Sequence, residues 1–299
     1  MKIILTGSLG HITKPLATTL IQQQHDVTII SSNPQKQTDI EAIGAQAAIG
    51  KMEDTDFLTK IFTGADIVYA MVAMPIFNVS MDQLLETVTQ IATSYTTAIQ
   101  NAAVKKAVFL STVGADRPGG NGILKYGYHI EQIYHRLAQE VQFKIMRPVG
   151  FYYNLLGFIP LIKSQGIIAS NYGGDTKKPW VSPIDIANTI ATAMLSPFEG
   201  RTFEYIASDE LSCTQIASML GESIGKPELQ WITVPDEQML QTLIHSGLHP
   251  STAQGFVEMQ ASMRDGRMYE DYYQHPPVLG TVKMQDYLPV FRQMYQSQS

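Results

Sequence analysis

The first seventeen residues, MKIILTGSLGHITKPLA, limit the fold of this chain more than any other stretch. The apolar strand KIILT runs directly into Gly7-Ser8-Leu9-Gly10, and an amphipathic helical pattern follows from His11. Glycine allows a sharp turn and a close approach of a ligand to backbone N–H groups, and a helix N-terminus favours an anion. The order of elements predicts a pyrophosphate-binding turn; the alternative is a plain strand-helix turn that holds nothing.

Strand and helix patterns alternate through the first half of the chain. Ser80 and Gln83 have the spacing of a capping box, which marks the start of the longest predicted helix. Alternation with short loops is typical of an α/β fold, a Rossmann-type doubly wound parallel sheet. Further strands are predicted at 26–32, 45–49, 66–74, 106–112 and 143–148, and helices at 11–24, 54–64, 80–101 and 129–140.

After Pro148 the chain becomes aromatic and is punctuated by glycine. We therefore expect two domains, a dinucleotide-binding Rossmann domain at 1–150 and a smaller C-terminal α/β substrate-binding lobe at 151–299. Segments of this lobe, at about 167–195, are expected to return to the main sheet. Residues 236–267 have a helical pattern, and the sequence leaves open whether they form a lid or a permanent wall.

Composition excludes several classes of protein. The 21 basic and 27 acidic residues give a net charge of -6, and the basic residues are scattered, so no nucleic-acid surface is expected. The single cysteine, Cys213, excludes a disulfide framework and fits a reducing compartment. There is no apolar run of the roughly 20 residues that a membrane span needs. We expect a cytoplasmic protein with no membrane partner and no metal site.

Longer motifs resemble the NmrA-like group of atypical short-chain dehydrogenases/reductases. They are FLSTVGAD at 109–116, MRPVGFYYN at 146–154 and SPIDIANTIATAML at 182–195, together with the glycine turn. Within that group, YHIEQIYHRL at 128–137 and the segment 265–291 are most similar to the NAD(P)H:quinone oxidoreductase branch. The resemblance implies a Rossmann domain with a small substrate-binding lobe, in agreement with the element pattern.

The resemblance implies two alternative functions. The first is an NAD(P)H-dependent oxidoreductase that transfers hydride to a quinone or a similar electron-poor carbonyl compound, its small-molecule substrate. The second is a non-catalytic NAD(P)-binding redox sensor of the NmrA type, whose contacts with a protein partner depend on the bound cofactor. A homodimer is compatible with either.

The resemblance also places the cofactor at the carboxyl ends of the strands, where ligands bind in open α/β sheets. The end of the second strand has no carboxylate to repel a 2′-phosphate, and Lys36 could reach one, so NADP(H) is favoured over NAD(H); alternatively Lys36 is a solvated helix residue. The predicted cofactor residues are Gly7, Ser8, Leu9, Gly10, His11, Ile12, Ser32, Asn33, Lys36, Val72, Ala73, Met74, Ser111, Thr112, Pro148, Val149, Gly150 and Phe151.

Ordinary short-chain dehydrogenases pair a tyrosine with a lysine four residues later, which this stretch lacks. Ile130 stands four residues after Tyr126, and Gln132 four residues after Tyr128. The remaining catalytic candidates are Lys125, Tyr128 and His129. A histidine has an ordinary pKa near 6.5 and could donate a proton, although structural histidines near helix starts are common.

Quinone reduction tolerates the loss of that pair, because a quinone accepts hydride readily and its product can take protons from water. The protein then has to hold two flat rings face to face. The aromatic segment after Pro148 suits a flat apolar substrate, and Tyr152, Tyr153 and Asn154 are predicted to contact it. The alternative is that these aromatic residues form a buried hinge between the lobes.

Overall fold

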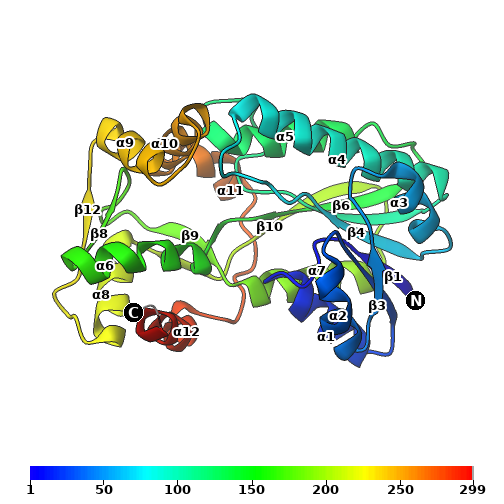
Figure 1. The fold of residues 1–299 in the computed structure, drawn as a ribbon, viewed down its shortest axis with the longest axis horizontal. Coiled ribbons are helices and arrows are strands. Elements are labelled where there is room, and N and C mark those ends of the chain that lie inside the picture. The colour runs from blue at the N-terminus through cyan, green and yellow to red at the C-terminus, as the bar shows by residue number, and fades with distance from the viewer. Residues whose placement is uncertain (298–299) are drawn as a thin grey trace.

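A computed structural model describes residues 1–297. Its centre is a seven-stranded sheet in the order β10-β6-β5-β4-β1-β2-β3, with every neighbouring pair parallel (Figure 1). This confirms the predicted Rossmann-type fold. The strands are β1 (Lys2–Leu5), β2 (Asp26–Ser31), β3 (Gln46–Ile49), β4 (Ile67–Met71), β5 (Lys106–Leu110), β6 (Gln142–Pro148) and β10 (Arg201–Ile206).

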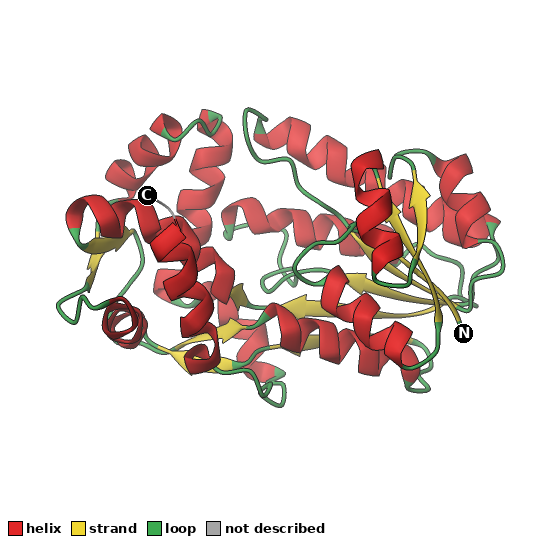
Figure 2. Ribbon diagram, turned by 60° about the horizontal axis from the view of Figure 1, so that its bottom comes forward, coloured by secondary structure: helices red, strands yellow, loops and turns green. Residues whose placement is uncertain are grey.

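Helices cover both faces of this sheet, which explains why its central strands are continuous apolar runs (Figure 2). Helices α3, α4 and α5 lie over one face, and α1 and α7 pack together on the other (Figure 1). The helices of this half are α1 (Thr13–Gln22), α2 (Gln37–Ala42), α3 (Thr55–Phe62), α4 (Met81–Asn101), α5 (Lys125–Tyr134) and α7 (Pro183–Leu195). The capping box at Ser80 and Gln83 is present.

Helix α5 begins and ends earlier than the sequence pattern indicates. It starts at Lys125, directly after a 3-10 turn at Gly122–Leu124, whereas the pattern predicted 129–140. Gly127 lies inside the helix, and a Cβ there would be 2.7 Å from Cγ2 of Thr112. Glycine has a poor intrinsic helix propensity, which favours a later helix start. The close packing of α5 on the end of β5 outweighs this preference, so the helix includes Gly127.

The second half forms two small sheets, in the orders β11-β9-β7 and β12-β8. Within residues 167–195, α7 packs against β5, β6 and β10 of the main sheet, whereas β8 and β9 pair in the small sheets; β10 is the later strand that joins the main sheet. The elements are β7 (Gly150–Phe151), α6 (Ile159–Gln165), β8 (Ile167–Ser170), β9 (Lys178–Val181), β11 (Asp209–Leu211), α8 (Cys213–Ile224), β12 (Gln230–Thr233), α9 (Asp236–His245), α10 (Pro250–Asp265), α11 (Glu270–Gln274) and α12 (Met284–Ser297).

Helix α10 packs against the first half of the chain, at the 3-10 turn before α5 and the start of α4. A Cβ on Gly122 would lie 1.9 Å from the carbonyl oxygen of Gly255, so the two backbones approach as closely as glycine permits. The hydroxyl of Thr252 donates to the carbonyl oxygen of Val79, and the N–H of Met81 donates to Ser251 at 3.1 Å. In this structure α10 is a docked wall beside the loop that follows β4.

Asp185, in the first turn of α7, holds the segment that returns from α11 to α12. Its carboxylate accepts hydrogen bonds from the hydroxyl of Ser208 and from the backbone N–H groups of Thr281 and Val282, at 2.6, 3.2 and 3.0 Å. A Cβ on Gly280 would lie 2.2 Å from the same carboxylate. The hydrogen bonds satisfy this buried carboxyl group, and they tie the C-terminal segment to α7.

Within the described residues, no helix is long and apolar enough to cross a bilayer. The same part of the chain contains no group of three or more His, Cys, Asp and Glu side chains arranged to hold a metal ion.

Lys178 is a charged group in the interior of the lobe. Only 2% of the residue is exposed, and its ammonium lies 5.9 Å from the centre of the Tyr269 ring. Burial lowers the pKa of Lys178 from its usual 10.5, and the attraction of Cys213 and Asp265 opposes this only in part. The folded state therefore binds this proton less tightly than the unfolded state.

Replacing Lys178 by Met should stabilise the protein, and most at low pH. Below the lowered pKa both states of the wild type are protonated and the folded state carries the full cost of the buried charge. Between that pKa and 10.5 only the unfolded state is protonated, so the advantage of Lys178→Met should shrink as pH rises and vanish above 10.5. Urea unfolding of both proteins across this range measures the difference; an advantage that is constant with pH would contradict the assignment.

Candidate functional site

The turn after β1 is left-handed. Gly7 has φ +92°, and Ser8 follows with φ +54°. A Cβ on Gly7 would lie 2.3 Å from Sδ of Met71 at the end of β4, so both the space and the backbone conformation require glycine. Gly10 differs, because a Cβ there would meet only the carbonyl oxygen of Gly7, at 3.4 Å. The space above Gly10 is open, as a cradle for a phosphate requires.

Two threonines fasten the turn to the sheet. The Thr13 hydroxyl donates to the carbonyl oxygen of Thr6 at 3.2 Å, and the Thr6 hydroxyl accepts a hydrogen bond from the N–H of Met71 at 2.8 Å. Thr13 occupies the position of the third glycine in the usual dinucleotide-binding pattern. Its hydroxyl connects α1 to β1. Because β1 and β4 flank the point where the strand order reverses, the turn opens into the crevice where nucleotides bind in such sheets. The turn therefore fits a pyrophosphate.

The end of β2 is connected to the same turn. The Ser8 hydroxyl donates to the Ser31 hydroxyl at 3.0 Å, and Asn33 accepts a hydrogen bond from the N–H of Gln35 at 2.9 Å. Lys36 lies 3.0 Å from a carboxylate oxygen of Asp39, and both side chains are largely exposed. A 2′-phosphate at Lys36 would therefore compete with an exposed ion pair, which is a weak obstacle.

Three stacked rings lie beside the glycine turn. The rings of His11 and Tyr153 are 4.7 Å apart and tilted by 24°, and those of Tyr153 and Phe151 are 5.0 Å apart and tilted by 28°. Burial raises the pKa of Tyr153 to about 12. A depression of about 370 Å³ opens beside His11, lined by Leu9, Gly10, His11, Lys14, Pro15 and Ile184. The stack connects the first helix to the residues that leave β6.

Tyr126 is a site residue that the sequence argument missed, since it was considered only as the partner of a lysine. It lies in the first turn of α5, half-buried, next to Tyr153 and hydrogen-bonded with Thr112 at the end of β5. Burial raises the pKa of Tyr126 to about 12, with Tyr153 contributing, while the hydrogen bond with Thr112 acts in the opposite direction. The phenol is therefore protonated near neutral pH and available as a donor.

The structure corrects the predicted role of Tyr152 as a substrate residue. Its side chain is fully buried, and its hydroxyl donates to a carboxylate oxygen of Asp209 at 2.7 Å. Burial first, and then the neighbouring Asp209, raise the pKa of Tyr152 far above its ordinary value. The two neighbours of Tyr152 in the sequence differ, because Tyr153 is half-buried in the stack and Asn154 is exposed.

Ser111, predicted to touch the cofactor, has its hydroxyl committed elsewhere. It donates to Glu131 of α5, which also accepts two hydrogen bonds from the Arg147 guanidinium at 3.0 and 2.7 Å. Arg147 in turn reaches Asp271 of α11 at 3.1 Å. This buried chain of polar groups joins β5, β6 and α11. The hydrogen bond to Glu131 therefore accounts for a serine at position 111 without a contact to a cofactor.

The other predicted residues divide by exposure. Ile12, Val72, Pro148 and Val149 have buried side chains and can offer only backbone atoms to a ligand. Leu9, Met74, Gly150 and the catalytic candidates Lys125 and Tyr128 are half-buried. Ser32, Ala73 and the third catalytic candidate, His129, are exposed. His129 thus lies on the solvent side of α5, away from the close contact between that helix and β5.

A parallel sheet with a left-handed glycine turn at its switch point defines a Rossmann-type nucleotide-binding protein. The sequence profile of the NmrA-like family matches residues 1–283, and the chain belongs to this family. An NAD(P)H azoreductase from Xenophilus azovorans is 22% identical over 263 residues, which cover 87% of this chain and 86% of that protein.

Solved structures share the fold over nearly the whole chain. The NADPH-dependent quinone oxidoreductase of Escherichia coli, complexed with NADPH, has a TM-score of 0.77 and 18% identity, covering 96% of this chain and 99% of that one. Triphenylmethane reductase from Citrobacter sp., complexed with NADP(H), has a TM-score of 0.74 and 16% identity, covering 97% and 100%.

Substitution of the two glycines should separate folding from nucleotide binding. Gly10→Ala should leave the unfolding curve nearly unchanged but weaken NADPH binding at least tenfold, because its methyl group fills only the space needed by the ligand. Gly7→Val should lower stability as well, since it forces β1 and β4 apart. Fluorescence titration with NADPH and urea unfolding measure the two effects. Unchanged NADPH affinity in Gly10→Ala would show that the turn does not hold the nucleotide.

Proposed function

We propose that this protein is a cytoplasmic NAD(P)H-dependent reductase that transfers hydride to a quinone or a similarly flat, electron-poor carbonyl compound. The observation that carries the proposal is the stack of His11, Tyr153 and Phe151 directly beside the glycine turn. Family membership and the azoreductase, quinone oxidoreductase and triphenylmethane reductase neighbours support a reductase that uses NAD(P)H.

The bound nicotinamide would supply the hydride. The backbone N–H groups of the turn and the N-terminus of α1 would hold the pyrophosphate, as an anion requires. Tyr153, on the wall of the crevice, would present a ring face to a flat substrate and exclude water from it. Positioning of this kind can supply most of the rate when the acceptor is already electrophilic.

NADP(H) is proposed as the preferred cofactor. The first turn after β2 offers the Lys36 ammonium, and its partner Asp39 is exposed and free to separate from it. No carboxylate stands between Ser32 and Lys36 in the sequence. A 2′-phosphate would meet one positive charge there and no fixed negative charge.

We propose Tyr126 as the hydrogen-bond donor to the substrate oxygen. Its phenol is half-buried between Thr112 and Tyr153 and stays protonated at neutral pH because its pKa is raised to about 12. A donor aimed at an oxygen that gains negative charge stabilises the transition state more than the ground state. The histidine expected to do this, His129, is exposed.

Steady-state reduction of a benzoquinone by NADPH and by NADH tests these assignments. Tyr126→Phe should lower kcat/KM by roughly ten- to a hundredfold, the effect of one hydrogen bond to a developing charge. Its NADPH affinity should be unchanged, and His129→Asn should remain within about twofold of the wild type. If His129→Asn loses the activity and Tyr126→Phe keeps it, His129 is the donor. If the wild type binds nucleotide but reduces no quinone, azo compound or related acceptor, the reductase proposal is wrong.

The second candidate is a non-catalytic NAD(P)-binding sensor. The missing Tyr-x-x-x-Lys pair favours it, together with the docking of α10 on the loop after β4, which connects the nucleotide crevice to the outer surface. Such a protein would bind nucleotide, lack turnover and retain a protein partner only in one redox state of the cofactor. Affinity capture in the presence of NADP⁺ or NADPH distinguishes the two functions.

A further inference from the structure

Two cationic side chains are buried within residues 1–297, those of Arg147 and Lys178. The Arg147 guanidinium has partners, because it donates to the carboxylates of Glu131 and Asp271 at 2.7 and 3.1 Å. Lys178, in β9, is 2% exposed, and in the same part of the chain its ammonium makes no hydrogen bond and no ion pair. Three N–H donors of a buried charge are thus left unused, which is costly unless another group accepts from them.

The neighbours of Lys178 do not supply the missing anion. Its electrostatic attraction comes from Cys213 and Asp265. Burial raises the pKa of the Cys213 thiol to about 12, although Lys178 opposes this, so the thiol is neutral at neutral pH. The Asp265 carboxylate is bound to Arg267, whose guanidinium donates to it at 2.8 Å. Neither group therefore forms an ion pair with Lys178.

Tyr269 is a second donor without a partner. It ends the 3-10 turn Arg267–Tyr269, it is 1% exposed, and its buried hydroxyl has no hydrogen bond with the described residues. The centre of its ring lies 5.9 Å from the Lys178 ammonium. Burial raises the pKa of Tyr269 far above its ordinary value, so the phenol keeps its proton and remains a donor. Two unused donors of different kinds thus lie in one small region.

Helix α8 begins beside Lys178. Lys178 pairs with Leu211 in the antiparallel ladder of β9 and β11, and Cys213, two residues further along, is the first residue of α8. Ser212 caps the helix by accepting from the N–H of Gln215 at 3.1 Å, whereas the N–H of Cys213 meets no acceptor in the described part of the chain. A helix N-terminus carries a partial positive charge. The ammonium, the phenol and the helix N-terminus all favour an anion.

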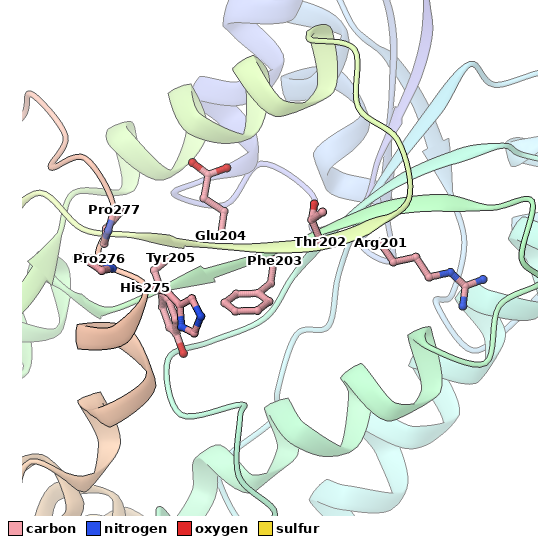
Figure 3. A pocket seen from close by; sticks show the side chains of 8 residues that line it. All are labelled: Arg201, Thr202, Phe203, Glu204, Tyr205, His275, Pro276 and Pro277. Atoms are coloured by element: carbon pink, nitrogen blue, oxygen red, sulfur yellow. The ribbon is translucent and has the colours of Figure 1, made fainter.

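The groove along β10 is a poorer place for an anion. It has a volume of about 610 Å³, and Arg201 lies at the opposite end of it from His275 (Figure 3). The Arg201 guanidinium already donates to the carbonyl oxygen of Leu137 at 2.6 Å, and His275 lies 3.3 Å from a carboxylate oxygen of Asp271. Unlike these two groups, the Lys178 ammonium has no partner that an anion would have to displace.

We propose that the Lys178 ammonium, the Tyr269 hydroxyl and the N-terminus of α8 hold a small oxyanion, a carboxylate or a sulfonate. The ammonium supplies the positive charge, and the phenol donates a hydrogen bond to one of the oxygens. The bound anion offsets the cost of the buried charge that Lys178 otherwise carries.

The oxyanion has two chemical sources, a free anion or an acidic group on the acceptor, and the second rests on the proposed function. The chain connects the site to the proposed reaction centre, because Met268 precedes Tyr269 and a Cβ on Gly114 would lie 3.8 Å from Cγ of Met268. Gly114 follows two residues after Thr112, the hydrogen-bond partner of Tyr126. An acidic acceptor would be held by its anionic group while its ring lies at Tyr126.

Urea unfolding of the full chain over rising sodium formate at neutral pH tests the site. At about ten times its dissociation constant, formate should raise the folded-to-unfolded ratio of the wild type about tenfold. Lys178→Met should lose this response, because the charge that binds formate is removed. Lys177→Met is the matched control: Lys177 is the exposed neighbour in the sequence, so the same change of charge should leave the response intact.

Tyr269→Phe tests the second donor. Without formate it should be at least as stable as the wild type, because it removes a buried hydroxyl that has no partner. Its affinity for formate should fall about three- to tenfold, the effect of one hydrogen bond. Equal formate responses in the wild type and in Lys178→Met overturn the proposal. So does a response that Lys177→Met loses to the same extent as Lys178→Met.

Reduction of a naphthoquinone and of its sulfonate by NADPH distinguishes the two sources of the anion. If the acceptor carries it, Lys178→Met should raise KM about tenfold for the sulfonate and leave KM for the uncharged naphthoquinone unchanged. If the anion is free, neither KM changes, while the formate response of stability is still lost. Absence of any turnover contradicts the proposed function alone, and the formate titration then decides the site.

Discussion

The close approach of the first strand to the end of β4 is the constraint on which the site depends. The main chain leaves β1 against the side chain of Met71, and only a residue without a Cβ, in a left-handed conformation, can stand there. Because Gly7 takes this place, Ser8 can reach the end of β2 and Thr13 can bond back to β1. The N–H of Ser8 donates to the carbonyl oxygen of Ile30, and the turn places the start of α1 at the switch point of the sheet. The same left-handed turn therefore both lets the strands pack closely and forms the candidate anion site.

The second half of the chain completes the crevice through direct continuity with the sheet. Phe151 and Tyr153 follow β6 within a few residues, so the strand that ends at the crevice also delivers the aromatic wall of the site. Helix α10 and the segment held by Asp185 then fix the lobe against the nucleotide-binding half. The residues proposed to hold a substrate ring and a nicotinamide therefore lie on elements that these contacts join.

Patterns that depend on neighbours in the sequence predicted the fold well. The alternating strands and helices and the capping box of α4 follow from periodicity and from residues three or four apart, which local geometry controls. Within 167–195 the pairing of the two strands could not be predicted, because a short apolar strand carries no signal that says which sheet it will join. Partner choice for β8 and β9 depends on contacts with β12, β11 and β7, some of them more than sixty residues away.

The candidate site divides in the same way. The sequence by itself determined the glycine turn, the missing lysine after Tyr126 and the family to which the chain belongs, since each is a matter of residue type and spacing. Only the tertiary structure decided that Tyr126 lies beside Thr112, that Tyr152 is buried on Asp209 and that Ser111 is bound to Glu131. The reason is physical: the burial and hydrogen bonding of a side chain are set by groups that only the folded chain brings together.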